Sequence, residues 1–594
     1  MGATATLEEV REAWTARWPE ALALWSPFTR LRPPRFCLTE EEEGAEGLTG
    51  SFAMIRLADQ RVVISLRQVS PDLVGFPLEI LGHEIGHHIL CPADLADNAR
   101  MLARIRLNLP TVEGHAPMVA NLYADLLIND RLQRARGLDM AGVYATLADA
   151  PATGDADGEE GAGRFWAFYM RLYEVLWSLP RGRIARGELD ERLLGDALLG
   201  ARLVRSFAGR WLEGAGRFGA LCLPYLLEET PGAEGAWTVW QDALGAGAGG
   251  FPDGLTGVEG SEGRRALHPS LDPELNGDLT GPAGEAPAEP EAGTQGGSRG
   301  QYREPFEYGE ILRASGLDLS DHEVAVRYYR ERAAGQLIPF PSRRSPVALD
   351  PLPEGTEPWD AGEELSEIDW VETALQGPVV IPGVTTVRRV WGTSPGAEPE
   401  RVPVDLDLYV DSSGSMPNPQ VTVSYLALAG AIVALSALRA GARVQATLWS
   451  GALEFTSTRG FVRDEGAVLK VLTGFFGGGT AFPIHVLRDT YGSRPPSAGP
   501  AHVLVVSDDG VNTMFELDEA GRPGREVARK ALREAGGGGT MVLNLWAPVD
   551  KVPGLHEAAE DGWEIFPVRD WADLVAFARA FSRRRYEEPG MVGR

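Results

Sequence analysis

The chain has 594 residues, too many for a single hydrophobic core, so several domains are expected. Its 84 acidic and 56 basic residues give a net charge of -28, which disfavours nucleic acid and anionic membranes as partners and favours basic proteins. Three widely spaced cysteines (Cys37, Cys91 and Cys222) exclude a disulfide framework and a cysteine zinc ribbon. The N-terminal sequence lacks an apolar signal core, and no apolar run is long enough to span a bilayer. We therefore expect a cytoplasmic protein.

The first 66 residues predict a helix followed by a small β element. Residues 6–25 have the spacing of an amphipathic helix, which ends before a proline-containing turn near residue 33. Two alternating segments, 53–57 and 62–66, predict a pair of strands around a short turn.

The segment after these strands carries three of the nine histidines in the chain. A helix is predicted from Pro77, in its first turn, to Leu90, before the next proline. At about 100° per residue, His83 and His87 lie one turn apart. They face away from a group of apolar residues: Leu78, Leu81, Ile85 and Ile89.

Two imidazoles at this spacing can bind one Zn2+ ion, and Glu84 between them can take a proton from a zinc-bound water. The segment His83-Glu-Ile-Gly-His87 resembles the His-Glu-x-x-His motif of zincin metallopeptidases. The resemblance implies a hydrolase with Glu84 as general base, and the preceding strands agree with the edge strand that borders a zincin substrate cleft.

A catalytic zinc site needs a third protein ligand. The predicted helix at 116–131 carries Asn121, Asp125 and Asn129 on one stripe, four residues apart. Asp125 stands among apolar residues, and a buried carboxylate must find a cation or several donors. Zinc or a salt bridge to a loop would satisfy it. His115 and Asp130 are alternative ligands.

Residues 50–135 together resemble a bacterial family of metallopeptidase-like domains that are fused to von Willebrand factor A (VWA)-like domains. Those domains also carry a histidine motif followed by an Asn-x-x-x-Asp helix. The resemblance implies that His83, His87 and Asp125 bind the zinc ion.

The middle of the chain predicts more helix and then a tether. Residues 164–230 continue in helical patterns whose dense aromatic residues indicate a helical core, so a mostly helical zincin-like domain is expected over residues 1–242. The Gly-, Pro- and Glu-rich residues 243–300 predict a flexible linker. Residues 301–400 predict a helical and proline-rich connecting arm, which Trp359 and Trp370 are expected to pack onto the C-terminal domain.

Residues 401–586 alternate strands and helices as a doubly wound α/β (Rossmann-like) fold does. Strands are expected at 404–411, 444–449, 503–507, 541–546 and 563–568, with a short edge strand near 453–456. Helices are expected near 421–439, 464–473, 524–534 and 571–585. The sequence contains no Gly-x-x-x-x-Gly-Lys-Ser/Thr loop, which excludes ATP hydrolysis by that route.

Two of these strands end in acidic residues, at the sheet edge where open α/β folds place their sites. The first leads into Asp411-Ser-Ser413-Gly-Ser415, and the second ends in Asp508-Asp509. Between them lies a glycine-rich loop that ends at Thr480. Carboxylates and hydroxyls suit a hard cation such as Mg2+ or Mn2+.

The Asp-x-Ser-x-Ser segment resembles the metal-ion-dependent adhesion site (MIDAS) of VWA domains, and the later pieces follow in the order of that site. The resemblance implies a VWA fold and an ion ringed by five residues: Asp411, Ser413, Ser415, Thr480 and Asp508. Asp509 is an alternative to Asp508.

Two functions follow from these resemblances. The first is a zinc peptidase-like protein whose MIDAS binds a carboxylate of a partner. Bacterial VWA proteins of this kind commonly work with MoxR-type AAA+ ATPases, which makes such an ATPase, or a substrate protein, the expected partner. The second is a non-catalytic adaptor with a structural zinc site that couples an AAA+ ATPase to protein remodelling or metal insertion. The VWA subunits of magnesium and cobalt chelatases favour this alternative, although they lack the zincin helix.

Overall fold

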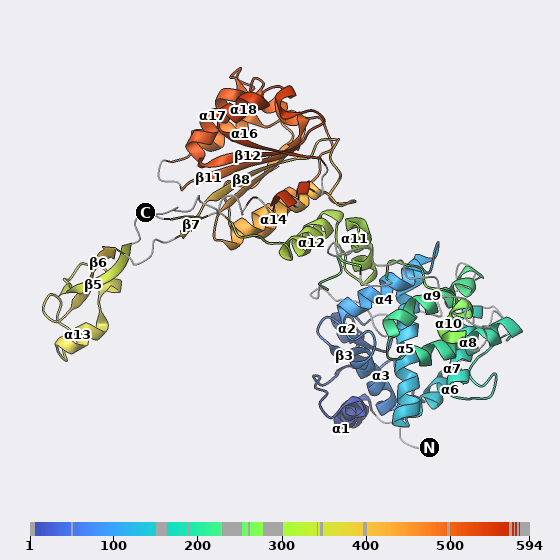
Figure 1. The fold of residues 1–594 in the computed structure, drawn as a ribbon. Coiled ribbons are helices and arrows are strands. Elements are labelled where there is room, and N and C mark those ends of the chain that lie inside the picture. The colour runs from blue at the N-terminus through green and yellow to red at the C-terminus, as the bar shows by residue number, and fades with distance from the viewer. Residues whose placement is uncertain are drawn as a thin grey trace, which may run out of the picture. The chain divides into compact units, whose positions relative to one another are not determined.

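The computed structural model describes residues 6–48, 51–149, 163–187, 189–228, 252–258, 262–276, 301–340, 342–344, 349–395, 401–495, 499–569, 573–574, 576–578 and 581. The chain divides into two compact units (Figure 1). Unit 1 comprises Met1–Glu331 with Gln420–Thr422, and unit 2 comprises Arg332–Pro419 with Val423–Arg594.

Unit 1 contains a three-stranded sheet in the order β1-β3-β2. The predicted strands are confirmed as β2 (Ala53–Arg56) and β3 (Arg61–Ser65), which pair antiparallel. A further strand, β1 (Arg35–Cys37), pairs parallel with β3 and was not predicted, because three residues show no usable alternation. The short helix α2 (Glu40–Glu46) follows β1.

The other described residues of unit 1 are mainly helical, as predicted. Its main helices are α1 (Leu7–Trp25), α3 (Pro77–Ile89), α4 (Leu95–Leu107), α5 (Ala116–Arg136), α6 (Met140–Asp149), α7 (Arg164–Leu176), α8 (Glu191–Ser206) and α9 (Trp211–Glu228). Helix α5 is the core of the unit: it packs against α3, α4, α6, α7, α8 and α9. From Ala116 to Leu132 every residue of α5 except Pro117 and Arg131 is buried.

Helix α3 differs from the two-faced helix that its sequence predicts. All residues from Ile80 to His87 are buried, because α1, α5 and β2 surround the helix. Ile89, assigned to the apolar side, is 40% exposed instead. The histidines therefore lie inside the unit rather than on an open polar face.

Parts of the segment predicted as a linker lie against the helices of unit 1. Arg217 Nε donates to the buried carboxylate of Asp272 at 2.5 Å. The backbone N–H of Ala266 donates to Asn108 Oδ1 at 2.9 Å. Residues 262–276 thus contact the helices, and residues 252–258 contact Arg327, whose Nη2 donates to the Pro252 carbonyl at 2.9 Å. The remainder of 243–300 lies outside the described residues. Helices α11 (Pro305–Ala314) and α12 (Asp321–Ala334) follow.

Unit 2 contains the α/β fold that the sequence predicts. Its six-stranded sheet has the order β10-β9-β8-β11-β12-β13, and every neighbouring pair is parallel except β10 with β9. The strands are β8 (Asp405–Asp411), β9 (Val444–Trp449), β10 (Phe455–Ser457), β11 (Ala501–Asp508), β12 (Gly536–Asn544) and β13 (Trp563–Val568). The parallel pairs bring the carboxyl ends of β8 and β11, and with them Asp411 and Asp508, to one edge of the sheet.

Helices cover both faces of this sheet (Figure 1). They are α14 (Tyr425–Arg439), α15 (Glu465–Leu472), α16 (Ile484–Gly492), α17 (Gly524–Ala535) and α18 (Leu555–Glu560). The sequence did not predict α16, and most of the closing helix predicted at 571–585 lies outside the described residues. Within the described chain, no helix combines the length and the apolar character that crossing a bilayer requires.

The predicted connecting arm contains strands that its proline-rich sequence did not indicate. Strand β4 (Ser342–Arg344) pairs with β7 (Arg401–Pro403), and β5 (Leu349–Pro358) pairs with β6 (Val387–Pro395) beside the short helix α13 (Trp370–Gln376). The indole of Trp359 is buried within this hairpin, where its Nε1–H donates to the Glu364 carbonyl at 3.0 Å, while Trp370 is 55% exposed. The hydrogen bond of Trp359 is local, and the expected packing of both tryptophans on the α/β domain stays a prediction.

Candidate functional site

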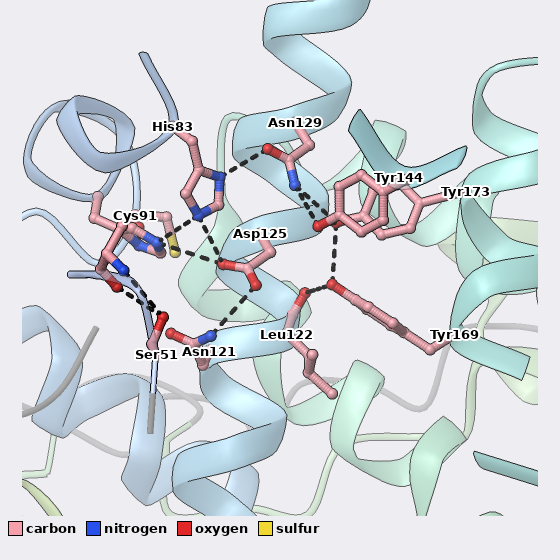
Figure 2. A network of polar contacts seen from close by, with 12 residues as sticks. Ser51, His83, Cys91, Asn121, Leu122, Asp125, Asn129, Tyr144, Tyr169 and Tyr173 are labelled. Atoms are coloured by element: carbon pink, nitrogen blue, oxygen red, sulfur yellow. Dashed lines mark hydrogen bonds and ion pairs between the residues drawn. The ribbon is translucent and has the colours of Figure 1, made fainter. Parts of the chain in front are cut away.

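Two histidines from α3 and one aspartate from α5 meet inside unit 1 (Figure 2). His83 Nε2 and His87 Nε2 lie 3.3 Å apart, and Asp125 Oδ1 lies 3.7 Å from the first and 3.4 Å from the second. One ligand atom of each residue falls within 4.8 Å of the others. The i, i+4 spacing on α3 places the two rings 4.9 Å apart and nearly perpendicular, and the packing of α3 on α5 brings in the carboxylate.

The other ring nitrogens fix how the histidines are oriented. His87 Nδ1 lies 3.1 Å from the Cys91 carbonyl oxygen, and His83 Nδ1 lies 2.8 Å from Asn129 Oδ1. Both oxygens can accept a proton from Nδ1, and in a neutral imidazole that tautomer leaves a lone pair on Nε2. Asn121 Nδ2 donates to Asp125 Oδ2 at 3.3 Å, which leaves Oδ1 toward the histidines.

Three acceptor atoms therefore point into one small buried space. Two nitrogen lone pairs and a carboxylate oxygen at these distances repel one another unless a cation lies among them. Two imidazoles and one carboxylate are a three-ligand set that Zn2+ uses, and the outer hydrogen bonds on both Nδ1 atoms are those that metal-bound histidines usually make. The residues present fit a zinc ion.

The alternative third ligands do not join this group. The Asp130 carboxylate, on the next turn of α5, accepts hydrogen bonds from Arg134, with Nη2 at 2.6 Å. His115 stands at the start of α5 and is not part of the three-residue group. Of the three candidates, Asp125 is the one that lies with His83 and His87.

The site is closed. The side chains of His83, His87 and Asp125 are 10%, 0% and 2% exposed. Glu84, the candidate general base, directly follows His83 and is 1% exposed. Water and a metal ion need little room, but a peptide would reach these groups only after the surrounding chain had moved.

Sequence reasoning missed the polar layer behind His83. Asn129 Nδ2 donates to the hydroxyls of Tyr144 and Tyr173, at 2.9 and 3.0 Å (Figure 2). The sequence placed Asn129 on the stripe with Asp125 but assigned it no role, and the tyrosines were taken only as helical core. A buried tyrosine hydroxyl must find a partner, which is the one signal that could have connected them.

A second group of polar side chains lies at the carboxyl edge of the sheet in unit 2. The Ser413 backbone N–H donates to Asp411 Oδ1 at 2.8 Å, and the Ser413 and Ser415 hydroxyls are 3.2 Å apart. Ser415 Oγ donates to Asp508 Oδ2 at 2.9 Å, and Ser507 Oγ donates to Asp411 Oδ2 at 2.5 Å. Burial raises the pKa of Asp411, with a smaller contribution from the nearby Asp508 carboxylate.

The glycine-rich loop packs directly on this group. A side chain at Gly414 would lie 3.2 Å from the Gly477 carbonyl oxygen, and the Gly414 N–H donates to the Gly478 carbonyl at 2.9 Å. Thr480 lies against Gly510, since its Cγ2 is 2.3 Å from the position of a Cβ there. The loop at 411–416 therefore lies beside 477–480, and Thr480 beside the loop that follows β11.

The neighbouring acids Asp508 and Asp509 make different contacts. Asp508 contacts Ser415, whereas Asp509 Oδ2 accepts a hydrogen bond from Trp546 Nε1 at 3.0 Å. The donor set at this edge consists of oxygen atoms only, which suits Mg2+ or Mn2+ rather than Zn2+.

Comparison with known proteins gives few relatives. No family model matches the sequence, and neither does any curated protein. Among solved structures, the pilus adhesin SpaC from Lactobacillus rhamnosus GG is 15% identical, with a TM-score of 0.23 over 31% of this chain and 30% of the adhesin. This chain thus spans less than a third of the adhesin.

An aerotolerance-related membrane protein from Bacteroides fragilis NCTC 9343 is 14% identical, with a TM-score of 0.20 over 31% of this chain and 99% of that protein. Scores of this size assign no activity and no partner to this chain. Fold and site define a protein with a helical unit that encloses a His-His-Asp group able to hold a metal, and with a separate α/β unit.

Proposed function

We propose that this protein is a zinc-dependent peptidase-like protein whose α/β unit is a VWA domain that binds a partner through a divalent cation. The observation that carries the first part is the convergence of His83 Nε2, His87 Nε2 and Asp125 Oδ1 in a buried space. In neutral imidazoles whose Nδ1 atoms donate outward, both Nε2 atoms are available as ligands beside this carboxylate oxygen.

A zinc ion held there would lower the pKa of a bound water and polarise a carbonyl oxygen. In the proposed reaction Glu84 takes the proton from the attacking water and later delivers it to the leaving amine. Asn129 and the Cys91 carbonyl hold the two imidazoles in place through Nδ1. Because the site is closed, substrate entry requires an opening movement of unit 1.

The second part rests on the oxygen cluster of Asp411, Ser413, Ser415 and Asp508, with Thr480 beside it. We infer that Mg2+ or Mn2+ binds here and keeps one position for a carboxylate of the partner. A cation overcomes the repulsion between that carboxylate and the two aspartates. The partner we propose is an AAA+ ATPase of the MoxR type or a substrate protein.

A second candidate function is a non-catalytic adaptor in which zinc is structural and the ATPase partner remodels a third protein. The zinc ligands and the general base are all buried, which favours this candidate: His83, His87, Asp125 and Glu84, with His87 at 0% and Glu84 at 1% exposed. Structural zinc sites are closed, whereas catalytic sites keep a position open to solvent or substrate.

The substitution Glu84→Gln separates the two candidates. It keeps the size of the side chain but removes the base, so zinc content should stay at the wild-type level. Cleavage of denatured casein or of a peptide library should fall by about 10²–10⁴-fold. Glu79→Gln, five residues earlier on α3, is the matched control and should change neither. If the wild type holds zinc but cuts no substrate in the presence of an ATPase partner, the adaptor function is correct.

The cation site is tested with Asp411→Ala. Mn2+ binding, measured by electron paramagnetic resonance, should be lost while the far-ultraviolet circular dichroism spectrum is unchanged. Asp509→Asn is the matched control, because Asp509 bonds to Trp546 and not to Ser415. Equal loss in both variants, or no loss in Asp411→Ala, would rule out the proposed ring of ligands.

A further inference from the structure

Behind His83 lies a chain of buried hydrogen bonds that ends on a backbone carbonyl (Figure 2). Asn129, which is 0% exposed, contacts His83 Nδ1 with Oδ1 and contacts the hydroxyls of Tyr144 and Tyr173 with Nδ2. The two hydroxyls are 3.1 Å apart. Tyr173 continues to the hydroxyl of Tyr169 at 3.0 Å, and this hydroxyl reaches the Leu122 carbonyl oxygen at 3.2 Å.

Counting protons along this chain gives it a single direction. The Leu122 carbonyl can only accept, so Tyr169 donates its one proton there. Tyr169 must then accept from Tyr173, and Tyr173, whose proton is used, must accept from Tyr144. Burial raises the pKa of both Tyr169 and Tyr173, so their hydroxyls keep their protons at neutral pH.

The direction of the chain decides how the Asn129 amide is turned. Tyr144 and Tyr173 both present lone pairs to Asn129, so the amide must offer them its two N–H groups. Its oxygen is then left for His83, and His83 Nδ1 must carry a proton to donate to it. A turned amide would leave its oxygen facing two hydroxyl oxygens whose protons are already used, and its N–H groups would favour the other tautomer of His83.

We propose that this chain, from the Leu122 carbonyl through Tyr169, Tyr173, Tyr144 and Asn129, fixes the tautomer of His83 and thereby keeps its Nε2 ready to bind a metal ion. Asn129 is then a positioning residue. Tyr169, two hydrogen bonds further from the metal, sets the orientation of the Asn129 amide. The proposal rests on the proposed zinc site. Groups in this outer position change metal affinity by about 10–100-fold when they are removed.

The test measures Zn2+ affinity by competition with a chromophoric chelator in the full chain. Asn129→Leu removes the oxygen that accepts the proton of His83 Nδ1 and should weaken binding by about 10–100-fold. Tyr169→Phe keeps the buried ring and removes only the hydroxyl that directs the chain, and it should weaken binding several-fold. Tyr123→Phe is the matched control: it also loses one buried hydroxyl, bonded to the Trp211 carbonyl at 3.2 Å, and should bind zinc as the wild type does.

A second measurement does not need zinc. Imidazole nitrogen chemical shifts in metal-free, histidine-labelled protein report the tautomer of His83, which should be Nδ1–H in the wild type and mixed in Asn129→Leu and Tyr169→Phe. Equal affinity and an unchanged tautomer in these variants would overturn the proposal, as would an equal loss of affinity in Tyr169→Phe and Tyr123→Phe. Absence of zinc binding in the wild type, with the expected tautomers present, would instead refute the proposed zinc function alone.

Discussion

Asp407 makes the stability of unit 2 dependent on pH. It lies on β8, on the same face of the strand as Asp411, and its side chain is fully buried. Gln445 Nε2 donates to its Oδ1 at 3.2 Å. Burial raises the pKa of Asp407 from 3.8 to about 7, because the interior disfavours the charged carboxylate.

The size of the effect follows from the two pKa values. Between about 3.8 and about 7, folded Asp407 holds a proton that the unfolded chain has released. The free energy of unfolding therefore falls as the pH rises through this interval, by about 4 kcal/mol in total, and stays level above it. An asparagine at this position never ionises, so Asp407→Asn should remove this fall.

Hydrogen exchange of β8 and β11 peptides, measured in the full chain at pH 5 and pH 8, gives the local free energies of opening. We expect Asp407→Asn to be more stable than the wild type at pH 8, by up to about 4 kcal/mol, with a much smaller difference at pH 5. Asp405→Asn, on the same strand, is the control: it loses an ion pair to Arg443 at 2.6 Å and should not gain stability. Identical pH profiles for Asp407→Asn and the wild type would refute the reasoning.

Three further predictions concern unit 1. A Cβ at Gly86 would lie 2.5 Å from Ile128 Cγ2. Gly86→Ala should therefore destabilise the protein by about 1–3 kcal/mol in urea unfolding and weaken zinc binding. Gly44→Ala is the control and should do neither, because a Cβ there would meet nothing within 4 Å. Arg67 and neighbouring hydrogen bonds hold the pKa of Glu43 at about 2, below its usual 4.5, so this contribution to stability is present above pH 4.5 and lost as the pH falls toward 2. Circular dichroism of acid unfolding should therefore show Glu43→Gln losing its difference from the wild type at low pH. Removing zinc with a chelator should speed hydrogen exchange in α3 and α5 but not in α17. The same change of exchange rate in all three helices, or no change in α3 and α5, would contradict the zinc site.

Much of the fold could be predicted because it depends on local patterns. Pro77 and the apolar spacing that follows it gave α3, and the long apolar runs gave the parallel strands of unit 2. Strand β1 and the hairpin β5–β6 could not be predicted, since three residues or a proline-rich run show no alternation. The burial of α3 on all sides depends on α1 and α5, which no pattern within α3 reveals.

The site could be predicted only as far as residue type and spacing reach. His83 and His87 at i, i+4 and a carboxylate among apolar residues were sufficient to expect the group that the structure brings together. The role of Asn129 depends on hydroxyls of α6 and α7, which are distant in sequence and whose partners are set by packing. For the same reason the contact of Asp508, rather than Asp509, with Ser415 needed coordinates.

A single helix, α5, supplies four groups of the site within little more than two turns: Asn121, the Leu122 carbonyl, Asp125 and Asn129. A small rotation or slide of this helix would disturb the carboxylate and its supporting bonds together, so partial versions of the pocket are disfavoured. Ion release should then coincide with cooperative loosening of the whole helical unit, and the bound cation would report on the integrity of the fold.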